Sequence, residues 1–141
     1  MKAFLDSSVL INAFQEAQPH HEPSVDLLAQ QKRATGFTAA HCLAETYSVL
    51  TRLPAIRRVG PEQVLLYLRN ICDRLTLIAL DEAEYVNVLA DAADAGISGG
   101  AIYDALIARC AVKAKAQVLY TWNLKHFQRF GPEIAKRVRE P

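Results

Sequence analysis

The sequence predicts an α/β fold, a three-layer α/β/α sandwich with a central parallel sheet of four or five strands. Short apolar runs that can form strands alternate along the chain with longer segments of helical spacing, which is typical of parallel sheets. The strand candidates are apolar throughout, as strands covered by helices on both faces must be. We expect residues 1–141 to form a single domain, because this length suits one hydrophobic core.

The first unit of this pattern is a buried strand that passes directly into a helix. The apolar residues 3–5 are followed by Asp6, Ser7 and Ser8, which are good helix N-caps, and residues 9–14 then have helical spacing. Further on, we expect Thr38 to cap the helix after the second strand. The remaining predicted elements are helices over residues 23–32, 39–52, 61–71, 82–95 and 101–116, strands over 34–38, 75–80 and 118–120, a capping box at Asp81 and Glu84, a short helical tail, and a small edge strand at Val138.

Composition excludes several classes of protein. The sixteen Lys and Arg residues nearly balance the fifteen Asp and Glu residues, so any attraction to nucleic acid must be local. No apolar run approaches the roughly 20 residues that span a bilayer, and the apolar start does not have the features of a signal peptide. Cys42, Cys72 and Cys110 lack paired spacing, which favours free buried thiols. We therefore expect a cytoplasmic protein without a membrane segment.

Acidic residues carry the functional prediction. Asp6 follows the first strand, and open parallel sheets bind ligands beyond the carboxyl ends of their strands, where the strand order reverses. Asp104 lies on the small apolar stripe of its helix, and a carboxylate there breaks the pattern as functional residues often do. Each has a structural alternative, since Asp6 could simply cap a helix and Asp104 could complement a helix dipole. Glu45 lies on a polar helix face with His41, Ser48 and Arg52, which is typical of a surface residue. It is a candidate only because Asp6 and Asp104 are candidates.

Three converging carboxylates would need protons or a cation. Their mutual repulsion is roughly 3 kcal/mol for each pair at about 5 Å and an effective dielectric near 20. Ligation by oxygen alone favours magnesium or manganese over zinc. His20 and His21 lie in a proline-flanked loop without a carboxylate at ligand spacing, so an exposed turn is the preferred interpretation there. The sequence lacks both a phosphate-binding glycine loop and a serine nucleophile elbow.

Four segments, spread over almost the whole chain, occur in a characteristic order. They are residues 4–8 (FLDSS), 44–50 (AETYSVL), 100–108 (GAIYDALIA) and 120–127 (YTWNLKHF). Together these segments resemble the PIN domain, and the size of the chain resembles that of the VapC-type toxins of bacterial toxin–antitoxin pairs. The resemblance implies an Mg²⁺- or Mn²⁺-dependent endoribonuclease that cuts RNA, forms a homodimer and is held inactive by a small cognate antitoxin.

The resemblance also implies roles for individual residues. By position, Asp6 and Asp104 match the principal metal ligands of the family, and Glu45 matches its second acidic residue. The family often has a fourth acid where this sequence has Asn123, which leaves a second metal ion open, although an amide oxygen can still act as a neutral ligand. The predicted catalytic residues are Asp6, Glu45, Asp104 and Asn123, the predicted metal ligands are Asp6, Asp104 and Glu45, and Thr121 and Ser7 are expected to contact the substrate.

The expected chemistry is hydrolysis of a phosphodiester bond. Glu45 would orient or deprotonate the attacking water, while Asn123 and Thr121 would hydrogen-bond the water or the phosphate. The family resemblance implies products with 5′-phosphate and 3′-hydroxyl ends. The basic residues that could contact phosphates are Arg52, Arg57, Arg58, Lys125 and Arg129, and the sequence assigns none of them individually.

Two alternatives stay open at this point. The first is a catalytically weak or inactive PIN-like RNA-binding module, motivated by Asn123. The second is a phospho-receiver switch, in which Asp81 would accept a phosphate and Lys125 would pair with that phosphate. A receiver needs an acidic pair at the end of its first strand, and here Asp6 is followed by two serines.

Overall fold

The computed structural model describes all 141 residues, and its centre is a five-stranded sheet in which every strand pair is parallel. The spatial order is β3-β2-β1-β4-β5. The strands are β1 (Ala3–Leu5), β2 (Gly36–Ala39), β3 (Thr76–Ile78), β4 (Val118–Tyr120) and β5 (Val138–Arg139). The predicted fold class and the small edge strand at Val138 are therefore confirmed.

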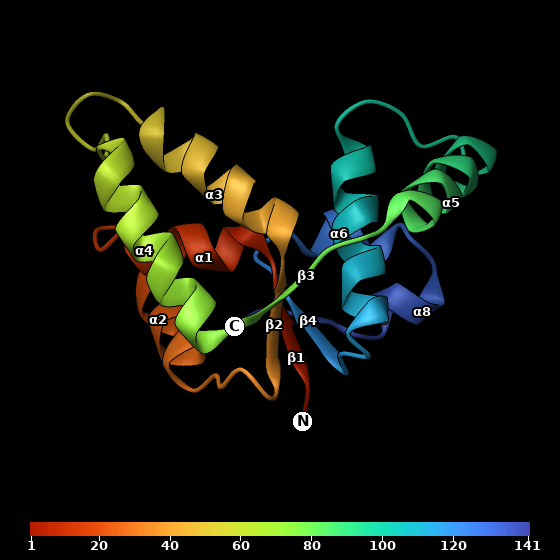
Figure 1. Ribbon diagram of the computed structural model, residues 1–141, viewed down its shortest axis with the longest axis horizontal. Coiled ribbons are helices and arrows are strands. Elements are labelled where there is room, and N and C mark those ends of the chain that lie inside the picture. Colours follow the sequence, from red (N-terminus) through yellow and green to blue (C-terminus); the bar gives the residue numbers. More distant parts are fainter.

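Helices cover both faces of the sheet, as Figure 1 shows. One face carries α1 (Ser7–Phe14), α2 (His21–Ala29), α3 (Ala40–Thr51) and α4 (Pro61–Arg74). The other carries α5 (Glu82–Asp94), α6 (Ala101–Lys113), α7 (Leu124–Gln128) and α8 (Pro132–Ala135). No helix combines the length and the apolar character needed to cross a membrane.

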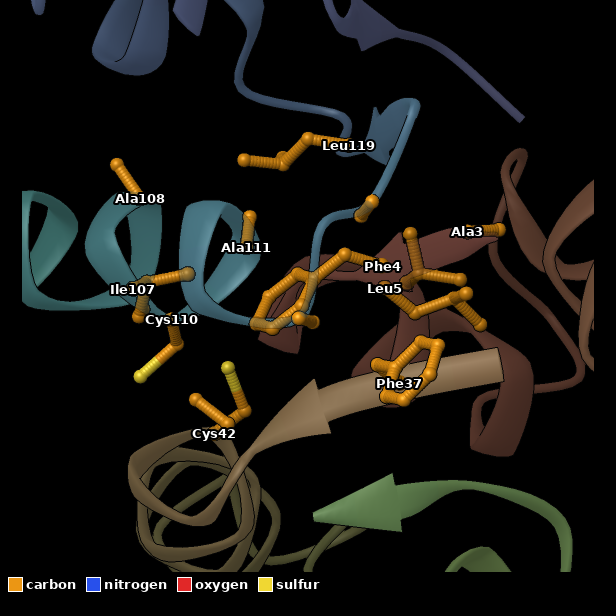
Figure 2. Packing of buried hydrophobic residues seen from close by; sticks show 14 of the residues in the cluster. Ala3, Phe4, Leu5, Phe37, Cys42, Ile107, Ala108, Cys110, Ala111 and Leu119 are labelled. Carbon is orange, nitrogen blue, oxygen red and sulfur yellow. The ribbon is translucent and has the colours of Figure 1, made fainter. Parts of the chain in front are cut away.

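The core is densest where α6 lies against the central strands. Phe4 of β1 is fully buried, and Figure 2 shows its ring pointing toward Ile107 and Ala111 of α6. Ala108 and Ala111 are also buried, and their small side chains let α6 approach the sheet closely. This packing places the first turn of α6, which carries Asp104, beside the carboxyl ends of β1 and β2.

Two predicted elements differ from the structure. Thr38 does not cap α3, because the N-cap is Ala39 and no side chain caps that helix. The Thr38 hydroxyl donates instead to the Leu5 carbonyl at 2.7 Å, since Thr38 still lies within the sheet. The run 75–80 is not a buried strand: β3 covers only Thr76–Ile78 and is partly exposed because it forms one edge of the sheet.

Smaller differences concern helix ends and one thiol. The capping box of Asp81 and Glu84 is present, as predicted. The helix predicted over residues 23–32 begins at His21 and ends at Ala29, and the one predicted over 101–116 ends at Lys113. All three cysteines are free, but Cys72 is only partly buried, contrary to the prediction.

Candidate active site

The candidate site lies at the point where the strand order reverses, between β1 and β4. Asp6 directly follows β1, and its backbone N–H donates to the Tyr120 carbonyl at the end of β4 at 3.0 Å. Thr121 follows β4 in the same way. Because neighbouring parallel strands end at the same edge of a sheet, the side chains of Asp6 and Thr121 meet there.

Asp6 is a buried carboxylate surrounded by hydroxyl groups. Its side chain is 2% exposed, and its Oδ2 accepts hydrogen bonds from Thr121 Oγ1 at 2.8 Å and from Ser8 Oγ at 3.0 Å. The side chain also caps α1 through the Ser8 backbone N–H, so the predicted cap is confirmed. These donors, which come from two elements, hold the carboxylate in one orientation.

Glu45 lies on α3, and its side chain reaches the same hydroxyl groups. Ser7 Oγ is 3.4 Å from Glu45 Oε1 and 3.4 Å from Asp6 Oδ1, so it lies between the two carboxylates. Burial, followed by the negative charges of Asp6 and Asp104, raises the pKa of Glu45 to about 7. Glu45 is therefore not the solvated surface residue that its helix face alone suggests.

Asp104 approaches from the other face of the sheet, in the first turn of α6. Its Oδ2 accepts a hydrogen bond from Arg129 Nη2 at 3.1 Å and lies 3.6 Å from His126 Nδ1. Burial and the charge of Asp6 raise the pKa of Asp104, while His126 and Arg129 partly oppose this shift. The Asp104 side chain is 21% exposed, so solvent can still reach it.

These oxygens form an acidic region rather than a finished metal site. No group of three His, Cys, Asp or Glu side chains is close enough in the structure to hold a metal ion by itself. Burial and then the charge of Asp6 nevertheless raise the pKa of both Glu45 and Asp104, so the three side chains face one region. The donors are carboxylate and hydroxyl oxygens, which suit a hard divalent cation, and magnesium usually keeps several water ligands. The residues present therefore fit such an ion.

The structure places the remaining predicted residues as follows. Asn123 is exposed, and its amide side chain makes no hydrogen bond within the chain. Thr121 is fully buried and Ser7 is 8% exposed, and the hydroxyls of both point to carboxylates. In this geometry Thr121 holds the Asp6 carboxylate in position, and its side chain is not accessible to a substrate.

Sequence reasoning missed the partners of Asp104. Arg129 is named from the sequence only as one of several possible phosphate contacts, and His126 is not singled out at all. Both come from the segment of α7, more than twenty positions along the chain from Asp104. No helical or strand spacing links such distant residues, so only the packing of α7 on α6 brings them together.

Thr121→Val is expected to destabilise the protein by about 2 kcal/mol, because the buried Asp6 carboxylate loses its shortest hydrogen-bond donor. Denaturant unfolding measures this change. Thr121→Ser keeps the hydroxyl and serves as the matched control, with a smaller loss. Equal stability of the valine variant and the wild type would contradict the proposed support of Asp6.

Comparison with known proteins agrees with this arrangement. Residues 3–131 match the model of the PIN domain. Ribonuclease VapC40 of Mycobacterium tuberculosis is 38% identical over 114 residues, which are 81% of this chain and 81% of that protein.

Solved structures agree on the fold. VapBC2 of Rickettsia felis, bound to a DNA fragment from its promoter, matches with a TM-score of 0.67 and 22% identity over 100% of this chain and 99% of that one. The sarcin-ricin loop cleaving toxin VapC20 of Mycobacterium tuberculosis matches with a TM-score of 0.68 and 16% identity, over 89% and 92% of the two chains. With the family match over residues 3–131 and the 38% identity to VapC40, this chain belongs to the PIN domain family.

Proposed function

We propose that this chain is a divalent-metal-dependent endoribonuclease, the toxin of a type II toxin–antitoxin pair. The observation that carries the proposal is that Asp6, Glu45 and Asp104 face one region at the sheet edge, where burial and then the charge of Asp6 raise the pKa of both other acids. The similarity to a ribonuclease, VapC40, over four fifths of the chain supports RNA as the substrate.

Asp6, Asp104 and Glu45 would hold the ion, which we propose is Mg²⁺ or Mn²⁺. When bound, such an ion polarises a phosphate oxygen and lowers the pKa of a coordinated water. Glu45, which lies beside Ser7 and the buried Asp6 carboxylate, is the group suited to orient or deprotonate the attacking water. Asn123 has a free amide that can hydrogen-bond the water or the phosphate. Ser7 and Thr121 would orient the carboxylates.

Two partners are part of the proposal. The likeness of the fold to VapBC2 supports a small cognate antitoxin that keeps the enzyme inactive. A homodimer is supported by exposed apolar side chains on α5, where Val86 is 57% and Leu89 is 50% exposed. We further propose that the protein acts in the cytoplasm, where its free thiols would stay reduced.

The other candidate functions are weaker. An RNA-binding module without activity is favoured only by Asn123, which stands where the family often has a fourth acid. The receiver interpretation is not supported, because the Asp81 carboxylate accepts the Glu84 backbone N–H at 2.8 Å and caps α5 beyond the edge strand β3.

Incubation of the purified protein with end-labelled single-stranded RNA tests the proposed function. Cleavage in Mg²⁺ or Mn²⁺ is expected, with 5′-phosphate and 3′-hydroxyl ends, and a chelator should stop it. A preparation that binds RNA but never cuts it in either metal would show a binding module instead of an enzyme.

A further inference from the structure

We infer that the groove between α3 and the first turn of α6 binds one nucleotide of single-stranded RNA beside the cut bond, with its base on Tyr103 and a neighbouring phosphate on Arg52. The inference rests on the proposed function, since it names the part of the substrate that lies next to the acidic region. Neither residue belongs to that region, so their contribution to RNA binding can be measured separately from cleavage.

The groove is continuous with the candidate active site. It has a volume of about 320 Å³, and its lining includes Glu45 and Ser48 of α3, the C-cap residue Arg52 and Tyr103 of α6. Glu45 therefore belongs both to the acidic region and to the groove, and Tyr103 directly precedes Asp104. Figure 1 shows α3 and α6 on opposite sides of the sheet edge where β1 and β2 end. An RNA strand bound at the acidic region can therefore continue into this groove.

Tyr103 has the properties of a base-stacking platform. Its side chain is 51% exposed, so a ligand can reach the ring. The ring is nearly parallel to that of His41, with an interplanar angle of 12° and a centroid distance of 5.2 Å, so it is held in place from one side. Proteins that bind single-stranded RNA stack its unpaired bases on exposed aromatic rings of this kind.

His41 connects the platform to Glu45. Its Nε2 atom is buried, has no hydrogen-bond partner and lies 3.6 Å from Glu45 Oε1. The imidazole ring of His41 therefore contacts both the Tyr103 ring and the carboxyl of Glu45, which joins the platform to the acidic region.

Arg52 supplies a positive charge to the groove. It caps the end of α3, seven positions after Glu45 and about 10 Å further along the axis, a separation that suits a neighbouring phosphate of the same strand. Its exposed guanidinium forms no ion pair or hydrogen bond within the chain, whereas Arg58 donates to Leu53 and Arg129 donates to Asp104. A free arginine there suits the next phosphate of a bound strand.

The first experiment measures binding of a fluorescein-labelled mixed-sequence RNA oligonucleotide by anisotropy, in chelator so that the RNA is not cut. Tyr103→Leu is expected to weaken binding by about 5- to 100-fold, because one stacked base is lost. Tyr103→Phe keeps the ring and should bind like the wild type. Tyr85→Leu, at a tyrosine of α5 that is 42% exposed, is the matched control and should leave binding unchanged.

The second experiment repeats the titration of RNA at several salt concentrations. Arg52→Gln should reduce the slope of log Kd against log salt by about 0.7, the value for one phosphate contact on a single strand. Tyr103→Leu should leave that slope unchanged, since stacking releases no counterions. Arg69→Gln, at an exposed arginine of α4, is the control for the loss of one positive charge. Unfolding curves confirm that each variant folds.

The outcomes separate this inference from the proposed function. If the wild type cuts RNA while Tyr103→Leu and Arg52→Gln bind it unchanged, the inference is wrong and the nuclease proposal stands. If these variants lose affinity for RNA but the wild type never cuts it, the nucleotide groove stands and the proposed activity fails. If they keep RNA binding and lose only antitoxin binding, the groove is a protein interface and the inference is wrong.

Discussion

Asp104→Asn is expected to lower metal-dependent RNA cleavage by about a thousandfold or more while the protein remains folded. A neutral amide in place of the carboxylate weakens binding of the cation, whose contribution to phosphodiester hydrolysis is several kcal/mol, and each 1.36 kcal/mol corresponds to about a tenfold change in rate. The fold should tolerate the change, because the Asp104 side chain is 21% exposed and its ion pair with Arg129 reaches the surface. Pairs of this kind contribute about 1 kcal/mol or less.

Asp91→Asn is the matched control for this experiment. Asp91 also pairs with an arginine, at 2.9 Å from Arg109 Nη2, but it lies on α5 outside the acidic region. We expect its cleavage rate to equal that of the wild type. Single-turnover rates in Mg²⁺, together with melting curves of all three proteins, make the comparison. Full activity of Asp104→Asn would falsify the proposed metal centre.

Glu45→Gln is expected to have two effects of opposite sign. Cleavage should fall by about 10²- to 10⁴-fold, because the variant has no carboxylate to take the proton of the attacking water. The metal-free protein should become more stable at pH 8, because the wild type must keep a half-buried negative charge beside Asp6 and Asp104. A residue that favours catalysis thus disfavours folding of the protein without its ion.

The pH dependence of stability follows from the direction of this shift. The pKa of Glu45 is about 7 in the folded chain and about 4.5 in the unfolded one, so between these values the folded state binds more protons. Stability of the wild type should therefore fall as the pH rises from 4.5 through 7 and level off through this group about one pH unit higher. The side chain is 34% exposed, so screening by solvent reduces the expected loss to about 1–2 kcal/mol.

Denaturant unfolding in chelator measures this difference. Glu45→Gln should be more stable than the wild type at pH 8 and equally stable near pH 4.5. Addition of Mg²⁺ at pH 8 should stabilise the wild type more than the variant. Glu62→Gln, at an exposed glutamate of α4, should follow the wild type at every pH. Identical pH profiles for Glu45→Gln and the wild type would show that Glu45 is neither buried nor close to the other acids.

Local sequence was sufficient where the deciding interactions lie within a few residues. The apolar run 3–5 followed by Asp6 predicted both β1 and the cap of α1, and Asp81 with Glu84 predicted the start of α5. The alternation of such units also predicted the parallel sheet and the edge at which the acids meet. These features depend on periodicity, caps and chain direction, which are present in the order of the residues.

Only the tertiary structure decided the environment of each side chain. Glu45 lies on a polar helix face, and its pKa near 7 arises because the fold buries it and then brings the charges of Asp6 and Asp104 toward it from other elements. Arg129 reaches Asp104 only because α7 packs beside α6. The sequence by itself determined which acids occur and at which strand or helix ends they stand. Their charges, burial and partners depended on contacts between distant segments, because electrostatic and packing energies follow distance in space and not separation along the chain.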